Sequence, residues 1–340
     1  MSPAAPGQRG VDALALHRDS IVVDGHCDSV LELMGFGFEG RTAEPRDLAI
    51  RGTRGHADIP RLLEGGVTAQ VFALFTADPY VKDAVAHTRR MLAAMEDLFD
   101  RTDQVRPARS SRDVHEAKAE GRLAAFLGIE GGEAIGNNLS ELESFYSRGV
   151  RLMGLTWNRR NALGRGAAAE GSGGLTDFGR RVVAEMERLG MIVDASHLSD
   201  EALDDLLAVA RRPIVASHSN SRTLRDHRRN LTDAQAEGIA STGGLVAVTF
   251  AGSFVDEVPE KVDLDRLLDH LDHLVSVIGA DHVGLGSDFD GYQDKNGTVL
   301  ADCTELPRLT ESLLGRGYDP SDVRAVLGGN WMRVIREVLG

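Results

Sequence analysis

Short apolar runs recur along the chain, and stretches with helical periodicity separate them. The runs are IVVDGH (21–26), VTAQVFALF (67–75), LAAFLGIE (123–130), RLMGLTW (151–157), MIVDAS (191–196), PIVASH (213–218), GLVAVTF (244–250) and HVGLGSD (282–288). Their length and their apolar or β-branched character are typical of buried strands. Amphipathic stretches at 175–190, 200–212 and 263–279 predict helices, the first with Thr176 as its N-cap and Gly190 at its end.

Alternating strands and helices with near-continuous apolar strands predict an α/β fold with a parallel sheet. Eight such units favour a closed (β/α)8 TIM barrel over an open doubly wound sheet. No linker divides the 340 residues, a length that single barrels reach. We therefore expect one domain over residues 1–340, with an N-terminal extension at 1–20 and a C-terminal helix at 318–340 packed on the barrel.

Histidines and acids follow the predicted strands at their carboxyl ends, where a TIM barrel carries its active site. Each alone has a structural explanation, such as a hydrogen-bonded core histidine, a helix cap or a turn. Together, three imidazoles and three carboxylates at one mouth would be unfavourable unless cations compensated them. The candidates are His26 and Asp28 after the first strand, Glu130 at the third, His197 at the fifth, His218 at the sixth and Asp288 at the eighth.

Imidazole and carboxylate together suit zinc and its first-row neighbours. We expect two divalent metals. His26 and Asp28 can hold one, and His197 and His218 can hold the other from equivalent points of consecutive units. Glu130 can bridge them with one oxygen toward each. Such a pair would lower the pKa of a shared water from 15.7 toward roughly 7, and the resulting hydroxide favours hydrolysis.

Asp288 is then the spare carboxylate, placed to take the proton of the attacking water; the alternative is a third oxygen ligand. Asp24 shares the face of His26 by alternation but lies deeper, and we interpret it as a buried support. Alternation points Cys27 away from the metals. Only two cysteines occur, Cys27 and Cys303, too few for a disulfide framework, and we expect reduced thiols.

The formal net charge of -14 argues against nucleic acid or a membrane surface as a partner, because it repels polyphosphate and anionic lipid. The first 20 residues lack the apolar core of a signal peptide, and no segment has about 18 uninterrupted apolar residues, so we expect a cytoplasmic protein. Five further histidines lie in helical or polar stretches and are expected to face solvent: His17, His87, His115, His270 and His273.

Seven segments in order resemble the renal or membrane dipeptidase family, the M19 metallopeptidases among the amidohydrolase-like barrels. They are VDGHCDSV, DIPRLLEGGVTAQVF, GIEGGEAI, VDASHLS, ASHSNSRTLRDHRRN, HVGLGSDFDG and LGGNWMRVIREV. The resemblance implies two zinc ions held by the ligands named above, with Asp288 handling the proton. It also implies that Arg229 of HRRN binds the carboxylate of a dipeptide. A homodimer is left open by this analogy.

One position departs from the family in a way that bears on substrate. Renal members carry a histidine in LTH that contacts the substrate near the scissile carbonyl, whereas this chain has LTWN with Trp157. An indole donates one hydrogen bond but cannot carry a proton. We expect Trp157 or Asn158 to shift the substrate preference; the alternative is that Trp157 simply lines the pocket.

The site residues and the resemblance together predict a zinc-dependent dipeptidase acting on L,L dipeptides, and they leave open whether L,D dipeptides are also cleaved. The first alternative is a related binuclear amidohydrolase acting on an N-acyl amino acid, lactam, lactone or phosphoester. Many such barrels use His-x-His and a modified lysine, whereas this chain offers His-x-Asp and Glu130, which favours the dipeptidase. The second alternative is a non-catalytic metal-binding barrel.

Overall fold

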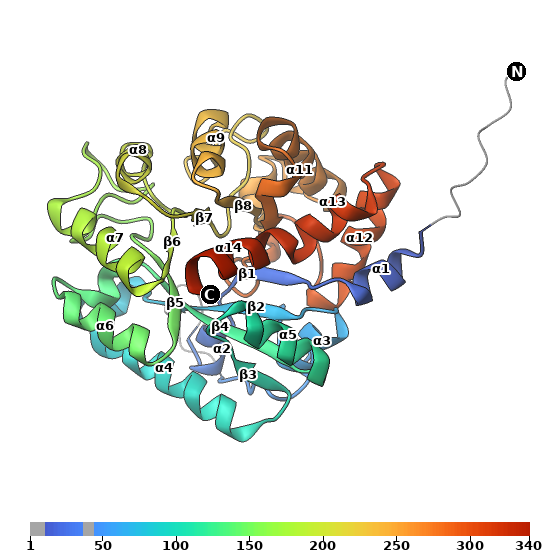
Figure 1. The fold of residues 1–340 in the computed structure, drawn as a ribbon, viewed down its shortest axis with the longest axis horizontal. Helices are drawn as coiled ribbons and strands as arrows, with labels where there is room; N and C mark the ends of the chain where they lie inside the picture. Colours follow the sequence, from blue (N-terminus) through green and yellow to red (C-terminus); the bar gives the residue numbers. More distant parts are fainter. Residues whose placement is uncertain (1–10, 37–43) are drawn as a thin grey trace, which may run out of the picture.

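Eight parallel strands close into a ring in the computed structural model, which describes residues 11–36 and 44–340 (Figure 1). The ring closes where β2 pairs with β4, in register from Ala69 opposite Ala124 to Phe75 opposite Glu130. This confirms the predicted (β/α)8 TIM barrel. Its strands are β1 (Val23–Cys27), β2 (Ala69–Phe75), β4 (Leu123–Glu130), β5 (Val150–Gly154), β6 (Ile192–Asp194), β7 (Ile214–Ala216), β8 (Leu245–Val248) and β9 (Val283–Leu285).

A further strand, β3 (Val105–Pro107), lies outside the ring and was not predicted. It runs parallel to the beginning of β4, with Val105 opposite Leu123. Three residues that include an arginine and a proline form no apolar run, so the pattern that identified the barrel strands could not detect it.

Helices surround the ring, and several of them are the next element after a strand (Figure 1). The predicted helix at 175–190 is present: the Thr176 side chain accepts a hydrogen bond from Gly179 N, and Gly190 ends the helix with a φ of 76°. The helices are α1 (Ala13–Asp19), α2 (Ser29–Leu33), α3 (Ile59–Glu64), α4 (Ala84–Arg101), α5 (Ser111–Glu120), α6 (Leu139–Ser147), α7 (Asp177–Leu189), α8 (Asp200–Val209), α9 (Asp233–Ser241), α10 (Gly252–Val255), α11 (Leu264–Ile278), α12 (Leu306–Gly315), α13 (Pro320–Arg324) and α14 (Asn330–Leu339).

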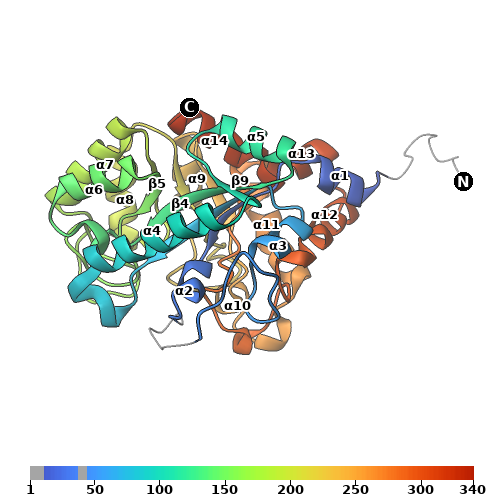
Figure 2. The same ribbon diagram turned by 90° about the horizontal axis from the view of Figure 1, so that it is seen from below.

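Helix α14 lies across one end of the ring (Figure 1), and α2 and α10 lie at the opposite end (Figure 2). Trp331 of α14 is fully buried, and its Nε1 donates a hydrogen bond to the Leu285 carbonyl at 3.0 Å. A Cβ at Gly25 of β1 would lie 2.1 Å from the Trp331 ring, so this position requires glycine. The amino-terminal end of the barrel is thus closed, and the carboxyl ends of the strands face the other way.

The expected extension at 1–20 is only partly described, because residues 1–10 lie outside the described part of the chain. Residues Ala13–Asp19 of that extension form α1. That residues 1–340 form one domain stays a prediction.

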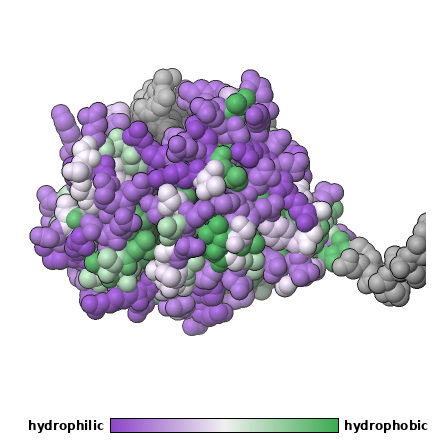
Figure 3. Space-filling model, turned by 90° about the horizontal axis from the view of Figure 1, so that it is seen from above, coloured by the Kyte–Doolittle hydropathy of each residue, from purple (hydrophilic) through white to green (hydrophobic). Residues whose placement is uncertain are grey.

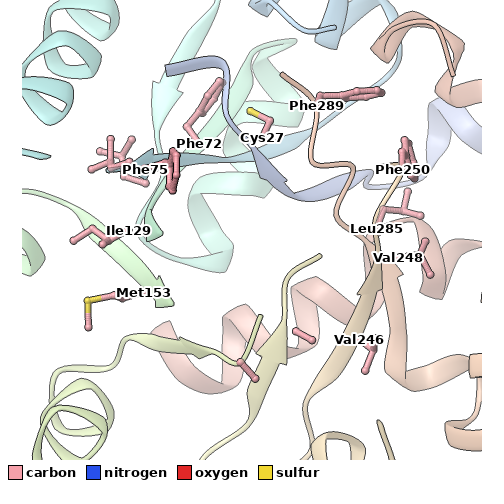
Figure 4. Close-up of a cluster of buried hydrophobic side chains, with 14 of the residues drawn as sticks. Cys27, Phe72, Phe75, Ile129, Met153, Val246, Val248, Phe250, Leu285 and Phe289 are labelled. Carbon is pink, nitrogen blue, oxygen red and sulfur yellow. The ribbon is translucent and has the colours of Figure 1, made fainter. Parts of the chain in front are cut away.

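Two buried hydrophobic clusters hold the barrel together. The inner cluster fills the ring and packs on α14. The outer cluster lies between the strands and the surrounding helices. Cys27 belongs to the outer cluster, with Phe72 and Phe289 nearby (Figure 4), as expected for a side chain pointing away from the barrel mouth. Both cysteines are free and buried, and burial raises the pKa of the Cys27 thiol well above its usual value.

Apolar side chains on the face shown in Figure 3 are interspersed with polar ones. Among the described residues, the large hydrophobic side chains that are exposed are Val11, Leu14, Ile50 and Val258. Within residues 11–36 and 44–340, no helix combines the length and the apolar character needed to cross a membrane.

The expectation that five histidines face solvent was wrong for three of them, because His17, His87 and His270 are buried. Two of these rings have backbone partners that compensate for lost hydration, whereas Nε2 of His87 has no hydrogen-bond partner among the described residues. His17 lies 2.9 Å from the Gly65 carbonyl, and His270 lies 2.8 Å from that of Val255. A histidine on a helix can therefore face the core when a backbone group lies within reach.

Candidate metal centre

Six histidine and acidic side chains from five strand ends converge at the open end of the barrel, and all of them are buried. Three groups of three have ligand atoms that lie within 4.8 Å of one another. The sequence-predicted candidates therefore do meet. The groups are His26, Asp28 and Glu130; Glu130, His197 and His218; and His26, His218 and Asp288.

Glu130, the last residue of β4, divides its carboxylate between two sets of histidines. Its Oε1 lies 2.9 Å from Nε2 of His197 and 4.0 Å from Nε2 of His218. Its Oε2 lies 3.4 Å from Nε2 of His26, which in turn lies 3.5 Å from Oδ2 of Asp28. The two oxygens thus face different halves of the site.

His197, which follows β6, and His218, which follows β7, each have a hydrogen-bond partner at Nδ1. Nδ1 of His197 lies 2.9 Å from Oδ1 of Asn158. Nδ1 of His218 lies 2.8 Å from the Ser217 hydroxyl, which donates to Asp194 at 2.5 Å. A ring whose Nδ1–H is engaged presents its lone pair at Nε2, so both rings can ligate a metal through Nε2.

The first strand departs from strict alternation, which changes the place of Asp24. Between Asp24 and Cys27, β1 contains one residue more than its partner β2, a β-bulge. Asp24 therefore does not join the side chains at the mouth, although a spacing of two predicted a shared face. Its carboxylate accepts hydrogen bonds from the backbone and hydroxyl of Ser287, at 2.7 and 2.6 Å, which fits the predicted supporting role.

Asp28 and Asp288 lie where the ends of β1 and β9 are joined. The Asp288 N–H donates to the His26 carbonyl at 3.0 Å, and the Asp28 N–H donates to that of Phe289 at 2.8 Å. Asp288 has a left-handed φ of 65°. A Cβ at Gly291 would lie 2.1 Å from an Asp28 oxygen and 2.4 Å from an Asp288 oxygen, so glycine lets both carboxylates approach.

Burial and the neighbouring charges shift the pKa values of the site groups in opposite directions. Burial lowers the pKa of His197 to about 3. Burial also opposes protonation of His26, but the carboxylates of Glu130 and Asp28 raise its pKa well above the usual value. Burial and then repulsion from Glu130 raise the pKa of Asp28 to about 6, and burial is the main cause that raises the pKa of Asp288. His26 and His197 lower the pKa of Glu130 against the opposing effect of burial, so Glu130 is stabilised in its ionised form while burial favours the neutral forms of Asp28 and Asp288.

Three buried polar atoms of the cluster have no hydrogen-bond partner among the described residues: Nε2 of His26, Oδ1 of Asp28 and Oε2 of Glu130. No arginine or lysine within the described chain lies within 4.0 Å of the carboxylates of Asp28, Glu130 or Asp288. A buried acid without a compensating charge costs several kcal/mol. The donor set of imidazole nitrogens and carboxylate oxygens therefore fits divalent metal ions.

A cavity of about 290 Å³ opens onto this cluster. Glu130, His197 and Asp288 line its inner side, and Trp157, Asn158, Phe254 and Tyr292 are among the residues of its walls. A larger cavity, of about 510 Å³, is lined by residues around the amino-terminal ends of β2 and β4 and contains none of the six clustered side chains.

The structure distinguishes between the two arginines of the HRRN segment. Arg229 is buried, whereas Arg228 is exposed. One Arg229 nitrogen donates to the His218 carbonyl at 3.2 Å, and the nearby acids Asp288 and Glu130 oppose the lowering of its pKa by burial. Arg229 thus lies against the cluster.

Trp157 is fixed between aromatic and cationic neighbours. Its ring centre lies 5.1 Å from that of Phe75, and the Arg159 guanidinium lies 4.9 Å over it. Arg159 also pairs with Glu133 at 2.9 Å and donates to the Thr76 carbonyl at 2.5 Å. The indole is therefore held by groups from the loops after β2, β4 and β5.

Sequence reasoning missed the residues that support the site from outside. Asp290 accepts hydrogen bonds from Arg46 at 2.7 Å, from the Ser29 hydroxyl at 2.5 Å and from the His56 N–H at 2.6 Å. The signal available was the repeated acid in SDFDG, where Asp290 was left without a role. For Asp194, the signal was the likeness of MIVDASHLS to PIVASHSNS, in which Ser-His follows each strand.

Comparison with known proteins agrees with this geometry. The family model described as membrane dipeptidase (peptidase family M19) matches residues 11–339. The chain is similar to the dipeptidase AC, a metallopeptidase of family M19, with 32% identity over 94% of this chain and 99% of that one and a TM-score of 0.84. A metallopeptidase from Rhodobacter sphaeroides bound to a phosphinate mimic of the dipeptide L-Ala-D-Ala is 30% identical, over 94% and 100% of the two chains, with a TM-score of 0.85. An amidohydrolase from Pseudomonas aeruginosa is 28% identical, over 97% and 100%, with a TM-score of 0.81. The chain belongs to the membrane dipeptidase family, peptidase family M19, and is a metal-dependent dipeptidase.

Proposed function

We propose that this dipeptidase works with two zinc ions, one held by His26 and Asp28 and the other by His197 and His218, with Glu130 shared between them. The observation that carries the proposal is the divided carboxylate of Glu130, whose oxygens lie 2.9 Å from His197 and 3.4 Å from His26. When bound, two such ions polarise a carbonyl and lower the pKa of water toward roughly 7.

Asp288 then handles the proton of the reaction. Its ligand oxygen lies within 4.8 Å of ligand nitrogens of His26 and His218, and Thr249 donates to it at 3.4 Å. A carboxylate here can accept a proton from the attacking water and pass it to the amine nitrogen as the C–N bond breaks. The alternative, in which Asp288 is a further oxygen ligand, predicts that its loss lowers zinc content as well as turnover.

Arg229 anchors the carboxylate of the substrate in this proposal. A guanidinium offers a two-pronged fork to a carboxylate, and the Nε of Arg229 has no hydrogen-bond partner among the described residues. Anchoring a free carboxylate next to the metals limits peptide length, because a longer peptide would carry its terminal charge out of reach. This geometry favours dipeptides.

The bound phosphinate in the Rhodobacter relative mimics L-Ala-D-Ala, which supports acceptance of a D-residue at the second position here as well as L,L dipeptides. The first alternative, a binuclear amidohydrolase acting on an N-acyl amino acid, lactam, lactone or phosphoester, draws on the relative described only as an amidohydrolase. Family membership favours the dipeptidase over this and over a non-catalytic metal-binding barrel.

Metal analysis of the purified chain, combined with hydrolysis of a mixed L,L and L,D dipeptide library, tests the proposal. We expect two equivalents of zinc and turnover of dipeptides but not of their C-terminal amides, because an amide removes the charge that Arg229 would bind. Two equivalents of zinc without dipeptide turnover would instead favour the amidohydrolase alternative. A single equivalent would refute the shared role of Glu130.

Trp157 is proposed to set the substrate preference. It lines the same cavity as Glu130 and Asp288, and Arg159 holds it there. Substituting histidine for Trp157 should change the order of preference across a dipeptide panel while leaving the zinc content as it was. An unchanged preference would mean that Trp157 only lines the cavity.

Cytoplasmic localisation, the absence of nucleic-acid and membrane partners, and a homodimer remain predictions from sequence and analogy. Size-exclusion chromatography coupled to light scattering would decide the oligomeric state.

A further inference from the structure

Asn158 contacts the candidate metal centre from the loop after β5. Its Oδ1 lies 2.9 Å from Nδ1 of His197, and Nε2 of that ring lies 2.9 Å from Oε1 of Glu130. An imidazole that ligates through Nε2 carries its proton on Nδ1, which then donates to a hydrogen-bond acceptor. The acceptor within reach is Oδ1, so this contact fixes which end of the Asn158 amide faces His197.

The other end of the same amide is left for the cavity. Asn158 lines the cavity together with Glu130 and Asp288. No described residue accepts a hydrogen bond from its Nδ2, and Nδ2 is not among the buried polar atoms that lack a partner, so it is accessible from the cavity. A neutral N–H donor in this position suits an oxygen on which negative charge develops.

Backbone hydrogen bonds hold the two residues in this relation. The Asn158 carbonyl accepts from the Ala168 N–H at 2.9 Å, and the His197 carbonyl accepts from the Ala167 N–H at 2.8 Å. The Thr156 hydroxyl also donates to the His197 carbonyl, at 3.3 Å. His197 itself has a left-handed φ of 68°, a conformation that its surroundings must maintain. The loop after β5 therefore fixes both the ring and the amide that contacts it.

We propose that the two ends of the Asn158 amide have different roles: Oδ1 positions His197 for metal binding, and Nδ2 donates a hydrogen bond to the oxygen of the scissile carbonyl. The proposal rests on the dipeptidase function and deepens it. It assigns a substrate-binding donor to the residue next to Trp157, whose indole cannot serve as a proton carrier.

Two substitutions separate the roles. Asn158→Ala removes both ends without adding charge, and Asn158→Asp keeps an acceptor for His197 but removes the donor. Zinc retention is measured by dialysis against a zinc chelator, and kcat and KM are measured on one dipeptide at saturating zinc. Asn137→Asp, an exposed asparagine in the loop after β4, is the matched control and should behave as the wild type.

For Asn158→Ala we expect about 10- to 100-fold weaker zinc binding and, at saturating zinc, a kcat lower by about 10²-fold. Asn158→Asp should retain zinc as the wild type does yet keep the lowered kcat. Wild-type zinc retention in Asn158→Ala would overturn the positioning role, and wild-type kcat in either variant at saturating zinc would overturn the donor role. Unchanged circular dichroism spectra show that both variants fold. A failure of the dipeptidase proposal is distinct, because the wild type itself would then bind no zinc or cleave no dipeptide.

Discussion

Two clusters of buried acids lie side by side at the open end of the barrel, and they are compensated in opposite ways. In the arginine-paired cluster, Asp290 and Asp58 are matched by Arg46 and Arg61, with nitrogen–oxygen distances of 2.7 Å for both Asp290–Arg46 and Asp58–Arg61. The strand-end cluster consists of His26, Asp28, Glu130, His197, His218 and Asp288. Its carboxylates have imidazoles as their close partners, and several of its ligand atoms have no hydrogen bond.

The difference shows which acids serve the fold and which serve the chemistry. Each Asp290 oxygen already receives hydrogen bonds from the chain, from Arg46 and Ser29 on one side and from the His56 backbone on the other. The protein thus supplies the whole environment that this charge needs. One oxygen of Asp28 and one of Glu130 have no hydrogen-bond partner among the described residues, and we expect metal cations to compensate them.

Substitution of Glu130 should have the largest effect. Glu130→Gln keeps the shape but removes the charge that two metals would share, so we expect zinc binding to weaken and turnover to fall by at least about 10³-fold. In chelator-treated protein the same substitution should lower the melting temperature, because it removes the negative charge that pairs with His26. Retention of wild-type zinc content and turnover would contradict the comparison.

Substitution of Asp290 should act on stability instead. Asp290→Ala removes the closest acid of the buried Arg46, and breaking a buried pair in this way costs about 3–5 kcal/mol. Urea denaturation measures the loss. The double variant Arg46→Met with Asp290→Leu, which removes both charges, should lose less than Asp290→Ala alone. A single variant as stable as the wild type would mean that this pair contributes nothing to the fold.

His270 extends the comparison to a third way of burying an ionisable group, in which the group stays neutral. Burial lowers the pKa of His270 to about 4 from an ordinary 6.5. Between these two pH values His270 is therefore protonated in the unfolded chain but neutral in the folded protein. The contribution of His270 to stability is therefore present above pH 6.5 and is lost progressively as the pH falls toward 4, by about 3 kcal/mol in total.

The variant His270→Gln should lack this pH dependence. Its destabilisation relative to the wild type, measured by urea denaturation at pH 7.5 and 4.5, should shrink at the lower pH. An equal difference at both pH values would show that His270 titrates alike in the folded and unfolded chains.

The smallest effect is expected at the surface pair of Arg148 and Glu96, which are one-third to one-half exposed and 2.6 Å apart. Glu96→Gln should change the free energy of unfolding by less than about 1 kcal/mol, because water screens the pair. Denaturation at low and high salt checks this. A loss as large as that of Asp290→Ala would remove the distinction between buried and exposed pairs.

The barrel and its cluster were accessible from sequence because both depend on local pattern. Apolar runs mark the strands, and in a barrel every carboxyl end faces the same mouth, so His197 and His218 could be placed together without knowing their contacts. Arg229 could be preferred to Arg228 because its spacing from His218 matches that of the family the sequence resembles.

Other features depend on contacts between distant residues, which a pattern does not contain. The bulge that separates Asp24 from His26 arises from the pairing of β1 with β2. The contact of Asn158 with His197 spans 39 positions. His270 lies on a helix, where its polarity suggested solvent, and the Val255 carbonyl that pairs with it comes from another element.

The position of Trp331 late in the sequence relates the order of synthesis to the assembly of the active site. Trp331 presses against Gly25 of β1 and bonds to Leu285 of β9, the two strands that lead into Asp28 and Asp288. A nascent chain lacks this contact until residues 330–339 have left the ribosome, so β1 and β9 gain it only after all eight barrel strands have been made. We therefore expect metal loading to follow translation rather than accompany it.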